Sequence, residues 1–195
     1  MGRIIAGAAG GARLASVKGE KTRPTTDRVK EALFSRLETY GVLAGARVLD
    51  LFAGSGALGL EAASRGATSV TLVDRDRSAL EACRRNREAL LNAGVGADIS
   101  VVNAQSSRYL GRANETWDVV FIDPPYAMPD AELAETLQQV ALRLADGAII
   151  VVERSTRSAE PTWGAALRRF GERAYGETTL WFAEPEPGAE QPADA

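Results

Sequence analysis

The residues best suited to chemistry are Asp123, Pro124, Pro125 and Tyr126, which are consecutive. They follow an apolar, β-branched run at 117–122 that predicts a buried strand. Two successive prolines fix two φ angles and remove two N–H donors, and the residue before a proline is biased toward an extended conformation. The segment therefore predicts a stiff loop that presents a carboxylate, backbone carbonyls and an aromatic ring.

Such a loop suits a flat nucleobase with an exocyclic amine. Oxygens of Asp123 and of the backbone would accept hydrogen bonds from the amine, while the Tyr126 ring would stack on the base. The alternative is a proline-stiffened turn between a strand and a helix, without a ligand. A Pro-Pro pair alone favours the turn, but the flanking Asp and Tyr, with a glycine-rich loop upstream, favour a binding site in a parallel α/β sheet.

The glycine-rich loop is the second candidate site. Gly54, Gly56 and Gly59 match the dinucleotide pattern G-x-G-x-x-G, and Asp74 follows at the end of the next predicted strand, where a carboxylate can bind ribose hydroxyls. The pattern fits an NAD site and an S-adenosylmethionine site alike. Asp50, directly before the loop, favours the second, because a carboxylate there would repel a pyrophosphate and attract an ammonium group, directly or through water. A strand–helix turn without a ligand is the remaining alternative.

A third contact is expected after the strand predicted at 98–102. Asn103, Ala104 and Gln105 would place polar side chains and main-chain groups beside an adenine bound there. A solvated loop is an equally good interpretation of these residues taken alone.

The elements that must position these loops alternate regularly. Strands are predicted at 47–51, 69–73, 98–102, 117–122 and 148–152, helices at 58–65, 76–92, 106–110 and 131–144, and a closing pair of strands at 167–174 and 178–183. This order predicts an α/β fold with a mostly parallel, seven-stranded sheet covered on both faces and an antiparallel edge.

The N-terminal part is predicted to be a hairpin or arm followed by a helix. Two short strands are expected at 3–6 and 12–17, and a helix begins after Pro24 and ends before Gly41. Its apolar stripe leaves Arg28 and Lys30 outside, available to a ligand or to solvent.

Composition and charge narrow the class further. The chain has 195 residues and a net charge of −3. The absence of histidine excludes histidine-dependent triads, and the single cysteine excludes an internal disulfide. No apolar run could span a bilayer and no secretory signal is visible, so we expect a cytoplasmic protein. Without histidine and with a single cysteine, a metal site built on these ligands is excluded, and we expect no bound metal. Residues 1–30 hold seven bases and two acids, which suits phosphate contacts or a merely solvated segment. The acidic tail at 184–195 lacks apolar periodicity and is predicted to be disordered.

The chain also resembles a known family. Residues 50–59 and 123–126, in this order, look like class I S-adenosylmethionine-dependent methyltransferases that act on exocyclic amines. Residues 23–34, together with the Gly-Arg-Ile-Ile start at 2–5, are similar to the RsmD family of 16S ribosomal RNA guanine-N2 methyltransferases. The resemblance covers roughly residues 2–183, and its N-terminal stretch is what distinguishes this family within the class.

The resemblance implies roles for individual residues. It implies a Rossmann-like methyltransferase domain at 41–183 behind an RNA-contacting arm and helix at 1–40, acting on 16S rRNA in the assembled small subunit. We expect a monomer, although the sequence leaves the oligomeric state open. Catalytic roles fall on Asp123, Pro124, Pro125 and Tyr126. Cofactor binding falls on Asp50, Phe52, Ala53, Gly54, Ser55, Gly56, Asp74, Arg75, Asn103, Ala104 and Gln105. RNA contacts fall on Arg3, Arg23, Thr25, Asp27 and Arg28.

Three other functions fit parts of the sequence. An adenine-N6 DNA methyltransferase would use the same Asp-Pro-Pro-Tyr loop, although no separate DNA-reading domain is visible. An NAD-dependent oxidoreductase would use the same glycine loop, but the missing histidine makes its proton transfer less natural. A non-catalytic RNA-binding module would keep the fold without turnover.

Overall fold

The computed structural model describes residues 2–17 and 26–188. Arg23 and Thr25 lie outside the described residues. The elements are β1 (Gly2–Arg3), β2 (Arg13–Leu14), α1 (Asp27–Thr39), β3 (Arg47–Asp50), α2 (Ala57–Ser64), β4 (Ser69–Asp74), α3 (Arg77–Asn92), β5 (Asp98–Asn103), α4 (Ser106–Leu110), β6 (Trp117–Ile122), α5 (Asp130–Ala141), β7 (Leu144–Ser155), β8 (Leu167–Tyr175) and β9 (Thr178–Pro185).

The main sheet has seven strands in the order β5-β4-β3-β6-β7-β9-β8. The pairs from β5 to β7 are parallel, and β9 runs antiparallel to both β7 and β8. This confirms the predicted mostly parallel sheet with an antiparallel edge. The chain proceeds outward from β3 to β4 and β5, then returns to place β6 on the other side of β3. The strand order therefore reverses between β3 and β6. In open parallel α/β sheets, ligands bind at the carboxyl ends of the strands where the order reverses.

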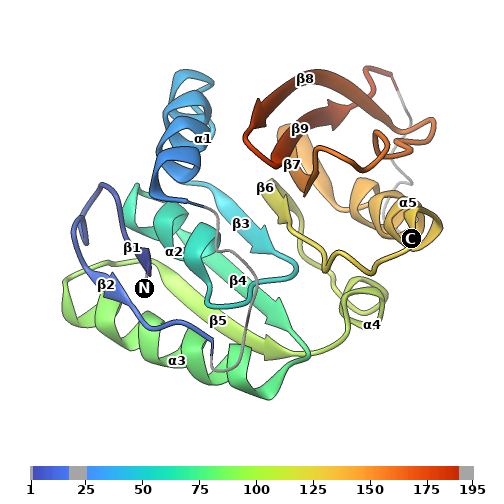
Figure 1. Ribbon diagram of the computed structural model, residues 1–195. Coiled ribbons are helices and arrows are strands. Elements are labelled where there is room, and N and C mark those ends of the chain that lie inside the picture. Colours follow the sequence, from blue (N-terminus) through green and yellow to red (C-terminus); the bar gives the residue numbers. More distant parts are fainter. Residues whose placement is uncertain (1, 18–25, 189–195) are drawn as a thin grey trace.

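Helices cover the sheet on both faces (Figure 1). One core lies beneath α1, α2, α3 and the N-terminal hairpin, which we define as residues 2–17, and the other lies beneath α4 and α5. The ring centroids of Phe34 in α1 and Phe121 in β6 are 5.6 Å apart, so α1 packs directly on the sheet. The N-terminal segment shares this core with the rest of the chain. The predicted boundary at residue 40 therefore separates proposed roles, not separate hydrophobic cores, and it stays a prediction.

Several predicted boundaries need correction. The hairpin strands β1 and β2 have only two residues each, because the backbone of Ile5 and Ala6 bonds to a side chain of α2 and not to a partner strand. Leu144, predicted to end a helix, begins β7. The predicted tail loses its first residues to the fold, since β9 continues to Pro185 and the Glu186 N–H donates to the Ala166 carbonyl at 2.9 Å.

Lys30 is the largest departure from prediction. Its side chain is 2% exposed, where the helical stripe placed it toward ligand or solvent. Its Nζ lies 3.5 Å from Glu61 of α2, which is fully buried, and also donates to the Arg3 carbonyl. A buried charge is tolerated when it is paired, and the partner here lies far away in the sequence.

The hairpin packs closely on the end of α2, which gives a test of this contact. A Cβ built on Gly7 (φ 83°) would lie 1.9 Å from the Ser64 carbonyl oxygen, whereas Gly11 (φ 86°) has nothing within 4 Å. We expect Gly7→Ala to cost roughly 1–3 kcal/mol more than Gly11→Ala, because both pay for the left-handed backbone and only the first also overpacks. Urea denaturation of the two variants measures the difference. Equal losses would show that the hairpin yields without cost.

Candidate active site

The two predicted loops emerge from neighbouring strand ends. Asp50, the last residue of β3, is paired with Phe121 of β6, and the Leu51 N–H donates to the Phe121 carbonyl at 3.0 Å. The arrowheads of β3, β4 and β5 point to one edge of the sheet (Figure 1). The glycine loop and the Asp123 loop therefore start side by side where the strand order reverses.

The glycine loop, defined as residues 51–56, has the backbone that its glycines predict. Gly54 has φ 54° and Gly56 has φ 79°, both in the left-handed region that favours glycine. Gly56 is the N-cap residue of α2 and caps it without a side chain. A Cβ built on Gly54 would meet nothing within 4 Å, so the loop has room for a ligand on that side.

Asp74 ends β4 beside this loop. Its Oδ2 accepts the Gly54 N–H at 2.9 Å, and its Oδ1 accepts the Asp76 N–H at 2.8 Å. A carboxylate can accept about four hydrogen bonds, so these two leave capacity for vicinal hydroxyls. The partly exposed side chain therefore fits the ribose-binding role, and the same two bonds fix it relative to the loop.

Asp50 lies beneath the loop instead of facing solvent. It is 2% exposed, and its Oδ2 accepts the Gly59 N–H from α2 at 2.9 Å. Burial raises the pKa of Asp50 to about 7, the Gly59 hydrogen bond opposes the rise, and the negative Asp74 adds to it. A cation bound nearby would favour the charged form, so Asp50 has the chemistry expected beside an ammonium group.

The raised pKa predicts how stability changes with pH. Between about pH 4, the ordinary carboxyl value, and pH 7, the folded chain keeps a proton on Asp50 that the unfolded chain has lost. Asp50 therefore makes the free energy of unfolding fall as the pH rises through this window. Asp50→Asn removes this dependence on pH. The free energy of unfolding of the variant, relative to that of the original chain, should therefore rise between pH 4 and pH 8 by roughly 1.4 kcal/mol for each unit by which the folded and unfolded pKa values of Asp50 differ. Urea denaturation at pH 4 and pH 8 tests this, and a difference that does not change with pH contradicts it.

The residues predicted to contact adenine lie at the next strand end. Asn103 ends β5 and is paired with Asp74, and the Ala104 N–H donates to the Asp74 carbonyl at 3.1 Å. Gln105 is the N-cap residue of α4. Asn103, Gln105 and Arg75 are exposed. The fold therefore brings these residues to the same edge as the glycine loop.

The Asp123 loop directly follows β6. Asp123 and Pro125 are exposed, while Pro124 is buried. The Met128 N–H donates to the Pro125 carbonyl at 2.9 Å, which closes a turn. Tyr126 is 71% exposed, an unusual state for a large aromatic side chain. Its ring is thus accessible for stacking.

Of the residues predicted to contact RNA, three are described. Arg3 in β1 and Asp27 at the start of α1 form an ion pair at 2.9 Å, with both side chains partly exposed. Arg28 is exposed. The Arg3–Asp27 pair joins the hairpin to α1, so part of the predicted basic charge is already compensated.

Two polar side chains near the site, Asn86 and Arg154, were not predicted from the sequence. Asn86, 2% exposed in α3, bonds to the backbone of both Ala15 and Ser55. Arg154 in β7 pairs with Asp130 at 2.8 Å, and its buried Nη1 has no hydrogen-bond partner. The helix that carries Asn86 was predicted, whereas Arg154 lies beyond the strand predicted at 148–152, because β7 continues to Ser155. Partners this distant in the sequence leave no local signal.

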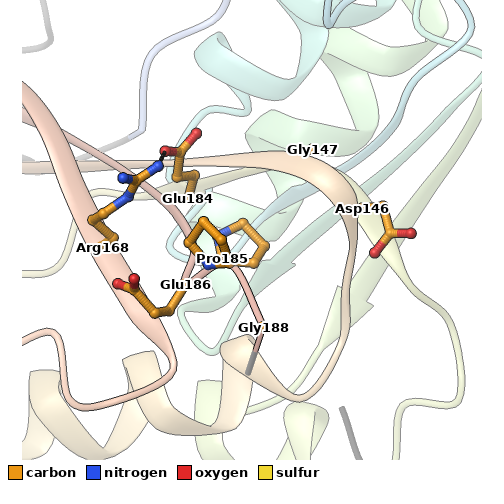
Figure 2. A pocket seen from close by; sticks show the side chains of 8 residues that line it. Asp146, Gly147, Arg168, Glu184, Pro185, Glu186 and Gly188 are labelled. Carbon is orange, nitrogen blue, oxygen red and sulfur yellow. Dashed lines mark hydrogen bonds and ion pairs between the residues drawn. The ribbon is translucent and has the colours of Figure 1, made fainter. Parts of the chain in front are cut away.

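Two surface depressions lie at the opposite edge of the sheet. One, of about 460 Å³, is lined by Asp146, Gly147, Arg168 and residues 184–188. Figure 2 shows the Arg168–Glu184 ion pair, 2.5 Å long, within it. These residues stand at the beginning of β7 and the end of β9, away from the carboxyl ends of the parallel strands. These depressions therefore do not coincide with the candidate site.

Residues 2–17 and 26–188 contain neither a candidate metal site nor a candidate membrane span. No cluster of acidic residues and cysteine there could hold a metal ion. No helix in that part of the chain is long and apolar enough to cross a membrane.

Comparisons with known proteins agree with this geometry. The family model described as "Conserved hypothetical protein 95" matches residues 2–184. The chain is 37% identical to "Ribosomal RNA small subunit methyltransferase D" of Escherichia coli K12, over 98% of this chain and 94% of the relative. It is 35% identical to "Putative rRNA methyltransferase YlbH" of Bacillus subtilis, over 90% of this chain and 95% of the relative.

A solved structure extends the similarity to the fold. "Putative methyltransferase yhhF from Escherichia coli" superposes with a TM-score of 0.80 at 36% identity, covering 94% of this chain and 97% of that one. The family model and the relatives span nearly the whole described chain, including the hairpin, the glycine loop and the Asp123 loop. The chain therefore belongs to the family described as Conserved hypothetical protein 95, the RsmD family.

Proposed function

We propose that this chain transfers a methyl group from S-adenosylmethionine to the exocyclic N2 amine of a guanine in 16S rRNA, with the assembled small subunit as substrate. The observation that supports this most is the placement of the glycine loop and the Asp123 loop on paired strands, β3 and β6. A methyl donor and an amine acceptor would meet between them. The name of the Escherichia coli relative supports small-subunit rRNA as the substrate class.

The cofactor would be held from three strand ends. Asp74 would bind the ribose, the backbone of Gly54 and Ser55 would approach the methionine part, and Asn103 to Gln105 would lie beside the adenine. Asp50 would complement the ammonium group from beneath the loop. The cofactor supplies an electrophilic methyl group on a sulfonium.

The Asp123 loop would prepare the nucleophile. The guanine amine is a poor nucleophile because its lone pair is delocalised into the ring. Hydrogen bonds to the Asp123 carboxylate and the Pro124 carbonyl would favour a pyramidal nitrogen and localise that pair. Tyr126, already exposed, would stack on a base that has left its helix or that a loop presents. Most of the rate would come from positioning.

The test is methyl transfer from radiolabelled S-adenosylmethionine to small ribosomal subunits that lack this modification, followed by digestion of the RNA to nucleosides. We expect label in N2-methylguanosine, with far less from protein-free 16S rRNA. Label in a different nucleoside would keep the amine chemistry and contradict the guanine assignment. Absence of label, with cofactor binding shown by calorimetry, would contradict the RNA substrate.

A further inference from the structure

Asn86 joins two segments that the proposed function uses separately. Its Oδ1 accepts the Ala15 N–H at 2.7 Å, and its Nδ2 donates to the Ala15 carbonyl at 3.0 Å and to the Ser55 carbonyl at 2.8 Å. Ala15 belongs to the N-terminal hairpin and Ser55 to the glycine loop. One amide therefore spans from the hairpin to the loop.

A second side chain of α3 contacts the same loop. Cys83, one helical turn before Asn86, donates from its Sγ to the Gly54 carbonyl at 3.2 Å. Burial raises the pKa of the Cys83 thiol, so it keeps the proton that this contact needs. Two consecutive carbonyls of the loop are thus turned toward α3.

This orientation has a consequence for a ligand. In a planar trans peptide the N–H points away from the carbonyl, so turning the Gly54 carbonyl toward α3 directs the Ser55 N–H to the opposite side. Carbonyl oxygens facing the ligand would repel the carboxylate of a methionine group, whereas an N–H would attract it. Holding both carbonyls on α3 therefore prepares the loop for that ligand.

We propose that Asn86 is a positioning residue that fixes the Ser55 end of the glycine loop against the N-terminal hairpin, so that cofactor binding and ordering of the hairpin are coupled. Because coupling between two sites is reciprocal, whatever orders the hairpin also favours the cofactor. The hairpin presents Arg3, one of the predicted RNA contacts, so RNA bound there would strengthen cofactor binding. This inference rests on the proposed function.

Calorimetry with S-adenosylhomocysteine tests the coupling without any RNA. Asn86→Ala should weaken binding by roughly fivefold to thirtyfold, as the loss of one or two buried hydrogen bonds implies. Asn92→Ala, an exposed asparagine of the same helix, should bind as the original chain does. Thr136→Ala removes a buried side-chain hydrogen bond within α5, from Thr136 to the Glu132 carbonyl, without touching the hairpin or the loop, and serves as the control for lost stability.

The outcomes are distinguishable. Equal weakening by Thr136→Ala and Asn86→Ala, at equal loss of melting temperature, would overturn the inference and indicate a purely structural role. Unchanged binding by Asn86→Ala would overturn it as well. In steady-state assays Asn86→Ala should raise the KM for S-adenosylmethionine and, because the coupling is reciprocal, the KM for small subunits as well. If the original chain fails to bind S-adenosylhomocysteine, the proposed function fails and this inference with it.

Hydrogen exchange gives a readout that needs no variant, and it decides the matter if Asn86→Ala does not fold. Adding S-adenosylhomocysteine to the original chain should slow exchange at the Ala15 amide together with the amides of Gly54 and Gly56. Protection of the two glycines with no change at Ala15 would overturn the coupling.

Discussion

Asp123→Ala should lower methyl transfer by at least about a hundredfold while leaving the affinity for S-adenosylhomocysteine within about twofold. A hydrogen-bonding group that acts on the reacting atom typically contributes a factor of 10² to 10³ or more. The expected separation of activity from binding follows from geometry. Asp123 comes after β6, whereas the residues proposed to hold the cofactor come after β3, β4 and β5.

The measurement pairs single-turnover transfer to small subunits with calorimetry on the same samples. Asp146→Ala is a matched control, because Asp146 is also an exposed carboxylate but lies at the opposite edge of the sheet. Asp123→Asn adds a second comparison, since it keeps one acceptor oxygen and removes the charge. Turnover by Asp123→Ala close to that of the control would contradict the proposed role of the carboxylate.

Tyr126 gives a related but smaller effect. Its ring is 71% exposed, so its removal costs the fold little, while base–aromatic stacking contributes about 1–3 kcal/mol. Tyr126→Ala should therefore reduce transfer by roughly five- to a hundredfold, and Tyr126→Phe should retain most of it. Loss of activity in Tyr126→Phe would show that the hydroxyl, and not the ring, matters.

The site loops at the carboxyl ends of the parallel strands could be predicted, because the sequence patterns that indicate them are local. Each loop of the candidate site follows directly on a short apolar strand, and parallel strands must bring those ends together. The special backbone of Gly54 and Gly56 was likewise implied by residue type. The predicted strand ends were therefore enough to place four site residues at one edge of the sheet: Asp50, Asp74, Asn103 and Asp123.

The polar interior was not predictable, because its partners are distant in the sequence. Periodicity assigns Lys30 to a polar helix face, and only the tertiary fold places it against Glu61. Asn86 of α3 is likewise buried, and its partners Ala15 and Ser55 lie far from it in the sequence. A buried polar side chain looks like a surface residue until its partner is known.

Of the buried polar residues Lys30, Glu61 and Asn86, Glu61 should be the most costly to replace. Glu61→Ala should lower the free energy of unfolding by roughly 3–5 kcal/mol. The Glu61 carboxylate accepts the N–H groups of Ile5 and Ala6 at 2.7 and 3.1 Å, and it pairs with Arg65 at 2.8 Å. It also faces Lys30, for which burial lowers the pKa and Glu61 opposes that shift. Without the carboxylate the ammonium would remain buried and uncompensated, and two hairpin amides would lose their acceptor.

A double substitution separates the charge from the packing. Lys30→Met combined with Glu61→Gln removes both charges and keeps both side-chain volumes, while the glutamine oxygen can still accept a hairpin N–H. It should recover a substantial part of the stability that Glu61→Ala loses, because replacing a whole buried pair is often nearly neutral, whereas breaking it is costly. Glu38→Ala, which removes only the half-exposed partner of Arg65, should cost at most about 1 kcal/mol. Urea denaturation at neutral pH compares the three variants. If the double variant is as unstable as Glu61→Ala, the hydrogen bonds to the hairpin, and not the buried ammonium, account for the loss.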